Sequence, residues 1–406
     1  MSQGLVVAIL SILFYLSNLL GGGMGQSVLP EHPSQVQQYY YVLGQTGQFL
    51  VDMTVRHTPQ GEGSPVGTVG AKQFATILDK NEGWYKIRLS SGLEGWVPEY
   101  SLVISTPIQK DTDKVILAYF SDDQGVYETL LEHGSQLNSL SPVGWNLNSY
   151  GELQPNFDPE KLGRSLYFAG NQKLETYGQI VISANPSRLL TNTQLQDQSI
   201  QGMVKMLEEW GLTGILLDFR YVPSGEQEQL IQFIDQLTST LKNQDLRILL
   251  ALPWDENLNY AGLTSSVDYF VLKAETERAT FEPGPLQNIH ELTKIVESIT
   301  KNVTPEKIIL GVTTGGLDWP RSGLPTTVTH QEILELAATH GATIKWDSQG
   351  QAPYFHYGTG HVVWFENRYS LKYKVDLIKS YQLAGIALQN LGQEDPEIWS
   401  LLERNL

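Results

Sequence analysis

Four charged side chains stand at the ends of two apolar runs, GILLDF and YFVLKA, which have the length of buried strands: Asp218 and Arg220, then Lys273 and Glu275. Side chains alternate along a strand, so the members of each pair share a face. If both faces point into one interior, two acids and two bases meet there, and buried charge is tolerated when it is paired. We therefore expect an ion network of these four residues. The alternative is that the second pair is displaced by one residue and faces outward.

General acid catalysis needs a side chain that can hold and release a proton near neutral pH. An arginine cannot, because its guanidinium has a pKa above roughly 12. Glu275 and Glu226 are the nearest carboxyls that could act instead of Arg220. Cationic neighbours would lower the pKa of Glu275, which argues against that role.

Other chemistry finds little support in the sequence. The eight histidines show no HExxH spacing, there is no cysteine, and no glycine-rich loop is followed by Lys-Ser or Lys-Thr. We expect no metal site and no cofactor. The formal net charge of -17 disfavours nucleic acid and anionic membrane surfaces as partners.

The N-terminus predicts export. The run from Leu5 to Leu20 is apolar and uncharged, and Gly21–Gly23 follow it. It is somewhat shorter than the about 20 residues of a membrane span and fits a secretory signal, although no Lys or Arg precedes Arg56. Residues 1–25 are therefore a cleaved signal peptide or an uncleaved anchor, and the membrane is a partner only through them. We expect the remainder to be secreted or held on the outer face of the cytoplasmic membrane.

Residues 26–48 are rich in Gln, Tyr, Ser and Gly and predict a linker. From 49 to 105, short β-prone runs alternate with glycine-containing turns, which predicts a small all-β barrel. In WYKIRL, the side chains of Trp84, Lys86 and Arg88 lie on one face and those of Tyr85, Ile87 and Leu89 on the other.

Between residues 114 and 406, apolar β runs alternate with amphipathic helical stretches, the pattern of βα units around a parallel sheet. Eight units fit an α/β fold of the (β/α)8 TIM barrel type, whose site lies where the strands end. We expect the strands at 115–120, 142–147, 179–184, 214–219, 247–253, 269–274, 307–312 and 385–390. The stretch of about 316–381 predicts a small α+β insertion before the last strand, with two strands and a helix before them.

The 49–105 segment resembles the bacterial SH3-like (SH3b) domain. MTVRHTP matches the start of that family, Gly83-Trp84-Tyr85-Lys86-Ile87 its central strand and Gly95-Trp96-Val97 its last strands. The resemblance implies binding of peptidoglycan through residues such as Trp84, Tyr85 and Trp96. A spacer without a ligand is the alternative.

The 114–406 segment resembles glycoside hydrolase family 18, and within it the spore-cortex and cell-wall N-acetylglucosaminidases. The matching motifs are GILLDFRYVP (214–223), EPGP (282–285), PEKIILG (305–311), Asp318-Trp319, APYFHY (352–357), VWFEN (363–367), Gly385-Ile386 and LGQEDP (391–396). They cover nearly the whole segment and imply the barrel fold.

In that family hydrolysis is assisted by the substrate's own N-acetyl group, an exception to the scheme with two carboxylates. The resemblance puts Asp218 at the position of the Asp that orients the acetamide and Arg220 at that of the acid Glu. Glu275 replaces a Tyr that binds the acetamide, and Gln389 replaces a Trp that floors the sugar. The resemblance also makes Lys273, Trp145 and Trp319 candidate ligand contacts.

We therefore expect a non-catalytic envelope protein that holds peptidoglycan or another N-acetylglucosamine glycan, or an envelope protein. The alternative is an active glycoside hydrolase that cleaves β-1,4-linked N-acetylglucosamine through a displaced acid. A scaffold that binds only protein is a third interpretation. The insert aromatics Tyr354, Phe355, Tyr357, Trp364 and Phe365 could stack on sugars or form the core of the insert, where His356 is expected to be structural.

Overall fold

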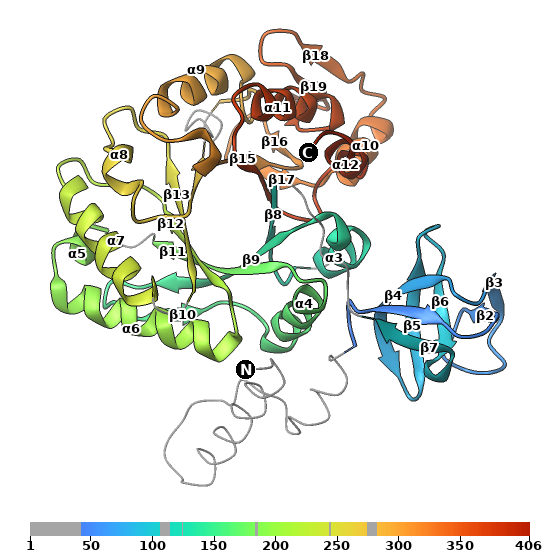
Figure 1. Cartoon of the computed structure of the whole chain (residues 1–406). Coiled ribbons are helices and arrows are strands. Elements are labelled where there is room, and N and C mark those ends of the chain that lie inside the picture. The colour runs from blue at the N-terminus through green and yellow to red at the C-terminus, as the bar shows by residue number, and fades with distance from the viewer. Residues whose placement is uncertain (1–41, 106–113, 124, 183–185, 243–244, 274–281) are drawn as a thin grey trace. The chain divides into compact units, whose positions relative to one another are not determined.

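A computed structural model describes residues 42–105, 114–123, 125–182, 186–242, 245–273 and 282–406 (Figure 1). They form two compact units, one of which combines the segment up to 105 with residues 158–174. Among the helices of these ranges, none has the length and apolar character needed to cross a membrane. The apolar run 5–20, on which the export prediction depends, lies outside the described residues.

The first unit contains a seven-stranded sheet with the strand order β3-β2-β6-β5-β4-β1-β7. Val55, Ile77, Ile87 and Val97 are fully buried at its centre. The strands are β1 (Thr46–Phe49), β2 (Met53–Arg56), β3 (Pro65–Val69), β4 (Phe74–Asn81), β5 (Trp84–Leu89), β6 (Glu94–Pro98) and β7 (Leu102–Ser105), with the 3-10 turn η1 (Glu99–Ser101) before β7. This is the expected small all-β barrel.

Strand β5 alternates as the sequence predicts, with Tyr85, Ile87 and Leu89 buried in the core. The first strand begins at Thr46, three residues before the expected start of the domain. It pairs antiparallel with the last strand, and Thr46 lies opposite Ser105. The chain therefore enters and leaves this sheet at paired positions.

The second unit is built on eight parallel strands in the order β9-β11-β12-β13-β14-β15-β21-β8, and a β8–β9 pairing closes the ring. Figure 1 shows helices around the outside of these strands. The strands are β8 (Val115–Phe120), β9 (Ser139–Leu147), β11 (Glu175–Ile182), β12 (Gly214–Phe219), β13 (Arg247–Pro253), β14 (Tyr269–Lys273), β15 (Ile308–Thr313) and β21 (Gly385–Gln389), and β10 (Leu153–Pro155) pairs antiparallel with β9. The predicted (β/α)8 barrel is confirmed.

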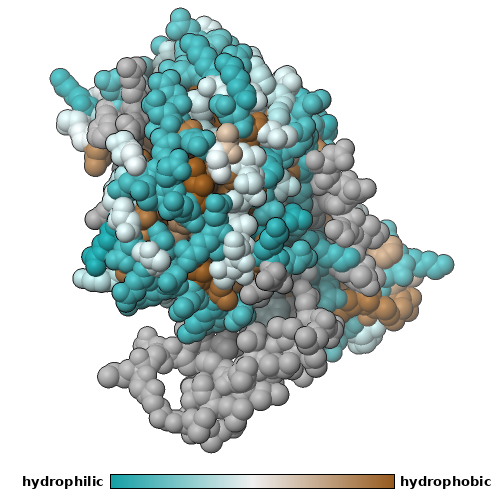
Figure 2. Space-filling model, turned by 60° about the vertical axis from the view of Figure 1, so that its left-hand side comes forward, coloured by the Kyte–Doolittle hydropathy of each residue, from teal (hydrophilic) through white to brown (hydrophobic). Residues whose placement is uncertain are grey.

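Amphipathic helices cover the barrel. Leu230, Phe233, Ile234 and Leu237 form the buried stripe of α7, at the predicted three- and four-residue spacing. The helices of this unit are α3 (Val126–His133), α5 (Pro186–Leu190), α6 (Thr193–Trp210), α7 (Gln227–Leu241), α8 (Tyr260–Leu263), α9 (Ile289–Ile299), α11 (Arg368–Ser380) and α12 (Ile398–Asn405), with the 3-10 turns η2 (Gly134–Gln136) and η5 (Pro305–Lys307). Helix α4 (Pro159–Asn171) belongs to the first unit. The face in Figure 2 is mostly hydrophilic.

The insertion between β15 and β21 contains more strands than predicted. It holds a five-stranded antiparallel sheet in the order β17-β16-β20-β19-β18, not two strands. One reason is that residues 345–357 form a hairpin, because Asp347 accepts a hydrogen bond from the backbone N–H of Gly350 and turns the chain. The elements are β16 (Gly316–Trp319), β17 (Thr326–Val328), α10 (His330–Thr339), β18 (Lys345–Asp347), β19 (Ala352–Tyr357) and β20 (His361–Phe365).

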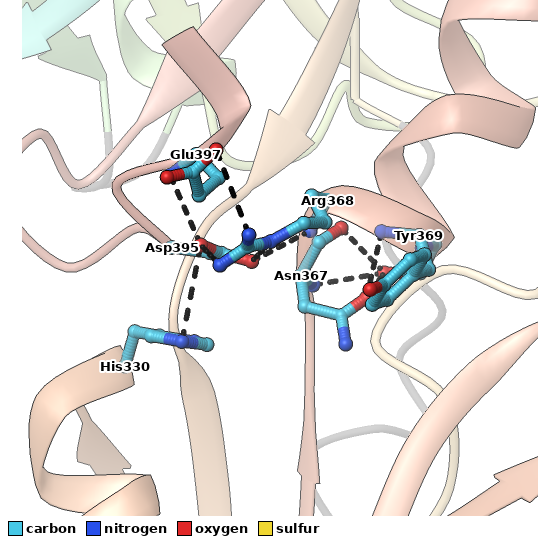
Figure 3. Close-up of polar contacts among 7 residues, drawn as sticks. His330, Asn367, Arg368, Tyr369, Asp395 and Glu397 are labelled. Carbon is cyan, nitrogen blue, oxygen red and sulfur yellow. Dashed lines mark hydrogen bonds and ion pairs between the residues drawn. The ribbon is translucent and has the colours of Figure 1, made fainter. Parts of the chain in front are cut away.

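A charged network ties the loop after β21 to the insertion and to α11 (Figure 3). The Nε and Nη2 atoms of Arg368 donate to the two carboxylate oxygens of Asp395, each at 2.8 Å. The Nε2 atom of His330 at the start of α10 lies 3.9 Å from the same carboxylate, and Arg368 Nη1 lies 3.6 Å from Glu397. Asp395 is thus the point where three segments of the chain meet.

Candidate functional site

Asp218 lies at the carboxyl end of the barrel interior. It is the fifth residue of β12 and follows Leu216, which belongs to the interior core, so alternation directs Asp218 inward as well. Its Oδ1 atom accepts a hydrogen bond from Lys273 Nζ at 2.5 Å, and its Oδ2 atom accepts one from Gln179 Nε2 at 2.7 Å. The carboxylate is only 7% exposed. Both of its oxygens are therefore bonded within the protein.

Lys273 ends β14 and faces the interior, as strand alternation predicts. Its side chain is 15% exposed, and its ammonium also donates to the backbone carbonyl of Phe219 at 3.3 Å. The outward-facing alternative is wrong for this residue. A paired charge at this depth is tolerated because each partner replaces the water that the other has lost.

The rest of the expected ion network stays a prediction. The side chain of Arg220 is exposed, and its backbone N–H donates to the carbonyl of Ile182 at 3.3 Å. Within the described ranges, the Arg220 guanidinium has no ion-pair partner. Glu275 lies outside the described residues.

Gln389 occupies the interior end of β21, where the resemblance anticipates an aromatic floor. Its Oε1 atom accepts a hydrogen bond from Thr313 Oγ1 at 3.4 Å, and its amide nitrogen lies over Gly311, 3.5 Å from where a Cβ would stand. The carboxyl end of the barrel therefore presents an amide at this position.

Gln179 is a member of the site that the sequence prediction missed. It is 5% exposed, and its amide group links β11 to Asp218 on β12. Its Oε1 atom is buried, and no described residue is hydrogen-bonded to it. The polar Gln at the start of the otherwise mostly apolar run QIVISA was the signal that could have revealed it.

Trp145 is placed away from the interior. It is 4% exposed and packs edge-on against Phe157 and Trp210, with ring centroids 4.8 and 6.4 Å away. The register between β9 and β11 shifts from Val143 to Trp145, a bulge that reverses the alternation of β9. The ring lies in the layer between sheet and helix and has no free face for a sugar.

Trp319 is also buried, at 3% exposure, and its indole N–H has no hydrogen-bond partner among the described residues. Its neighbour Asp318 accepts hydrogen bonds from Tyr357 at 2.6 Å and from His361 Nδ1 at 3.0 Å. The pKa of Tyr357 is raised to about 12. Burial is the larger cause, and the hydrogen bond that the hydroxyl donates to Asp318 is the second.

Three of the five insert aromatics pack in or against the core of the insert. Phe355 and Phe365 are buried in the core of the insert with Ile333, and Tyr357 packs against that core. Tyr354 and Trp364 stack on each other across β19 and β20, with centroids 4.6 Å apart. His356 is exposed at the edge of Tyr354.

In the small β unit, Trp84 and Trp96 are partly exposed on the outer faces of β5 and β6. Glu94 pairs there with Lys86 at 3.3 Å and with Arg88. Tyr85 is 7% exposed and belongs to the core, so its ring is not available to a ligand. The outer face offers two indoles beside charged groups.

The carboxyl end of the barrel interior holds a paired carboxylate. Asp218 is bonded there by a cation and an amide, and the neighbouring Arg220 carries a group that cannot donate a proton at neutral pH. The described residues contain no group of three or more His, Cys, Asp or Glu side chains arranged to hold a metal ion. A small cavity is lined by Leu147, Asn148, Gly151, Ile182, Leu189 and Leu195, and Asp218 does not contribute to it.

Comparisons with known proteins agree with the fold. The profile of the bacterial SH3 domain matches residues 52–103, and that of glycosyl hydrolases family 18 matches residues 178–394. The chain is 28% identical over 236 residues to the cortical fragment-lytic enzyme of Bacillus subtilis, covering 53% of this chain and 54% of that protein. The chain thus spans about half the length of the curated relatives it matches.

Solved structures show the same barrel. The spore cortex-lytic enzyme SleL of Bacillus megaterium superposes with a TM-score of 0.66 at 23% identity, over 78% of this chain and 77% of that one. A chitinase from Chromobacterium violaceum superposes with a TM-score of 0.66 at 25% identity, over 72% of this chain and 98% of that one. Since the matched profile covers just over half of the 406 residues, this chain belongs to glycosyl hydrolase family 18.

Proposed function

We propose that this chain is an exported cell-envelope protein that binds peptidoglycan, or another glycan containing N-acetylglucosamine, without hydrolysing it. One observation carries the proposal: Asp218 is bonded by Lys273 and Gln179. The resemblance adds that Arg220 takes the position of the family's proton donor. General acid catalysis typically contributes about 10² to 10⁴ in rate, so its loss removes a large part of turnover. The cell-wall and cortex relatives support the class of ligand.

The bonding of Asp218 also supports the absence of turnover. A sugar acetamide that takes the place of Lys273 at this carboxylate would leave the ammonium, among the described residues, with the carbonyl of Phe219. Separating the two charges is costly where only 15% of the lysine side chain is exposed. A ligand therefore competes with a charge-assisted hydrogen bond that is already made.

The domain arrangement fits an envelope binder. We propose a signal peptide or anchor at 1–25, a linker at 26–48, an SH3-like domain at 49–105 and the barrel at 114–406 with its insert at about 316–381. Trp84 and Trp96 on the outer face of the small unit are the candidate wall contacts there. Gln389 and Arg220 are the candidate glycan contacts at the barrel end.

The test measures binding and turnover on the same preparation. The full chain is titrated with N-acetylglucosamine tetrasaccharide by calorimetry and is then incubated with purified peptidoglycan while reducing ends are counted. We expect binding, no release of reducing ends above the blank, and weaker sedimentation with peptidoglycan for Trp84→Ala combined with Trp96→Ala. Steady release of reducing ends would contradict the proposal. Absence of binding to either glycan would instead support the scaffold that binds only protein.

A second candidate is an active glycosidase with a displaced acid. The observation in its favour is Glu226 at the N-terminus of α7, in the loop that follows β12, because its Oε2 atom is shielded from solvent and finds no hydrogen-bond partner in the described part of the chain. If reducing ends are released, Glu226→Gln and Glu275→Gln are compared with the native chain. Loss of release in one of them identifies the acid, and equal release in both excludes these two carboxyls.

A further inference from the structure

An aromatic strip lies on the outer surface of the barrel unit, formed by Trp346 on β18 and by Tyr369 and Tyr373 on α11. The three side chains are 40%, 65% and 43% exposed. The rings of Trp346 and Tyr373 have centroids 6.4 Å apart at an angle of 34°. Tyr369 precedes Tyr373 by four residues, so the two share one face of the helix. None of these rings takes part in the site around Asp218.

The indole of Trp346 is held in one orientation. Its Nε1 atom donates to Gln351 Oε1 at 3.1 Å, and Gln351 Nε2 donates to the carbonyl of Ser348 at 2.7 Å. Gln351 adopts a φ of 54°, a left-handed conformation that a residue with a side chain rarely adopts. The hairpin thus keeps a strained backbone at the residue that fixes the ring.

The supporting turn is rigid as well. The Oδ2 atom of Asp347 accepts a hydrogen bond from Gly350 N–H at 2.7 Å. The carbonyl of Gly350 accepts one from Ile289 N–H at the start of α9. A Cβ at Gly350 would lie 2.4 Å from Pro285 Cγ, so the hairpin packs directly on that segment. A half-exposed ring on an anchored turn is preorganised, so a ligand that binds it loses little free energy in ordering the ring.

The aromatic side chains of the strip indicate which class of ligand it can bind. Tyrosine and tryptophan offer an apolar ring face together with a polar edge, which suits a ligand that carries C–H faces and hydroxyl groups. The charges on the same helix face are already paired, since Lys372 bonds Asp376. Figure 3 shows Tyr369 next to Arg368 and Asn367, and its backbone N–H donates to Asn367 Oδ1 at 3.0 Å. An uncharged partner fits this surface better than an anionic or cationic one.

We propose that Trp346, Tyr373 and Tyr369 form a second glycan-binding surface, which stacks on successive N-acetylated sugars of a polymer outside the barrel end. The proposal takes its class of ligand from the proposed function but uses different residues. A polymer chain can span several rings, whereas a short oligosaccharide gains little from a shallow surface. The strip should therefore act on polymers.

The experiment compares retention on insoluble chitin, a polymer of N-acetylglucosamine, with calorimetric titration by soluble tetrasaccharide, both using the full chain. We expect Trp346→Ala, and Tyr369→Ala combined with Tyr373→Ala, to weaken retention on chitin by about tenfold each and to leave tetrasaccharide binding unchanged. Tyr150→Ala, at a 62% exposed tyrosine of the same unit, is the matched control and should retain native binding.

A further variant separates ring orientation from folding. Gln351→Gly suits the left-handed backbone but removes the bond to the indole, so it should keep or raise the melting temperature and still weaken retention on chitin. Native retention in the strip variants, equal losses in Tyr150→Ala, or no retention of the native chain on chitin would overturn the proposal. Tetrasaccharide binding without retention on chitin would contradict the proposed second glycan-binding surface but not the proposed function.

Discussion

The ammonium of Lys273 on β14 lies 2.5 Å from the carboxylate of Asp218 on β12, across the carboxyl end of the barrel interior. The contact occupies one oxygen of the carboxylate that the resemblance puts at the position of the acetamide-orienting Asp. Gln179 completes the arrangement from the next strand of the ring. The pair is thus a structural element of the barrel as well as a candidate site.

Replacing Lys273 with Met should leave Asp218 buried with one neutral partner. We expect a loss of about 2–3 kcal/mol in the free energy of unfolding, less than for a fully buried pair because the lysine is partly exposed. Urea denaturation measures it. Lys273→Met combined with Asp218→Asn should recover part of the loss, and Lys301→Met on the exposed surface should have little effect. An unchanged single variant would show that the pair adds nothing to stability.

The ion pair between Glu366 and Lys374 offers a sharper comparison. Its side chains are 3% and 2% exposed, with both carboxylate oxygens 2.8 Å from the ammonium, and Ser370 donates to Glu366 at 2.7 Å. Lys374→Met should reduce the free energy of unfolding by about 3–5 kcal/mol. Lys372→Met, two residues away in an exposed pair, should change it by no more than about 0.5 kcal/mol. Similar losses of unfolding free energy in the two variants would show that burial of the pair is not the cause of the loss.

Stability should fall in mild acid because of His330. Burial lowers the pKa of His330, although the adjacent Asp395 opposes the shift and Arg368 adds to it. A base whose pKa is lower in the folded state is stabilising while neutral. Its contribution is therefore complete above the unfolded value of 6.5 and is lost as the pH falls from there through the folded pKa.

Melting temperatures at pH 7.5 and 5.5 test this. The melting temperature of the native chain should fall more on acidification than that of His330→Gln, whose side chain cannot titrate. The Arg368–Asp395 bond should persist across this range, since hydrogen bonds from Arg368 hold the pKa of Asp395 low despite its burial. Equal losses in both proteins would exclude His330 as the source.

Much of the fold follows from local patterns in the sequence. Strands β8, β12 and β13 have the predicted bounds because their apolar runs are flanked by polar or turn residues. The inward direction of Lys273 followed from alternation alone. What escaped prediction depends on other strands: the bulge that turns Trp145 outward appears only in the register with β11.

The candidate site was predicted in part for the same reason. Asp218 and Lys273 are charged residues in apolar strands, and such residues are conspicuous. The bond that Gln179 makes to Asp218 depends on the stagger of β11 against β12, which a single strand does not reveal. The exposure of Arg220 depends on where β12 ends, since the chain leaves the sheet directly after Phe219.

The pairing of Thr46 with Ser105 has a consequence for how this protein could have been assembled and how it can be modified. A module whose two ends lie opposite each other on neighbouring strands can be added, duplicated or removed with little displacement of the sequences on either side. Homologous proteins should therefore differ in the number of such modules while their barrels remain alike. For the same reason, a binding module of another specificity could be exchanged at this position.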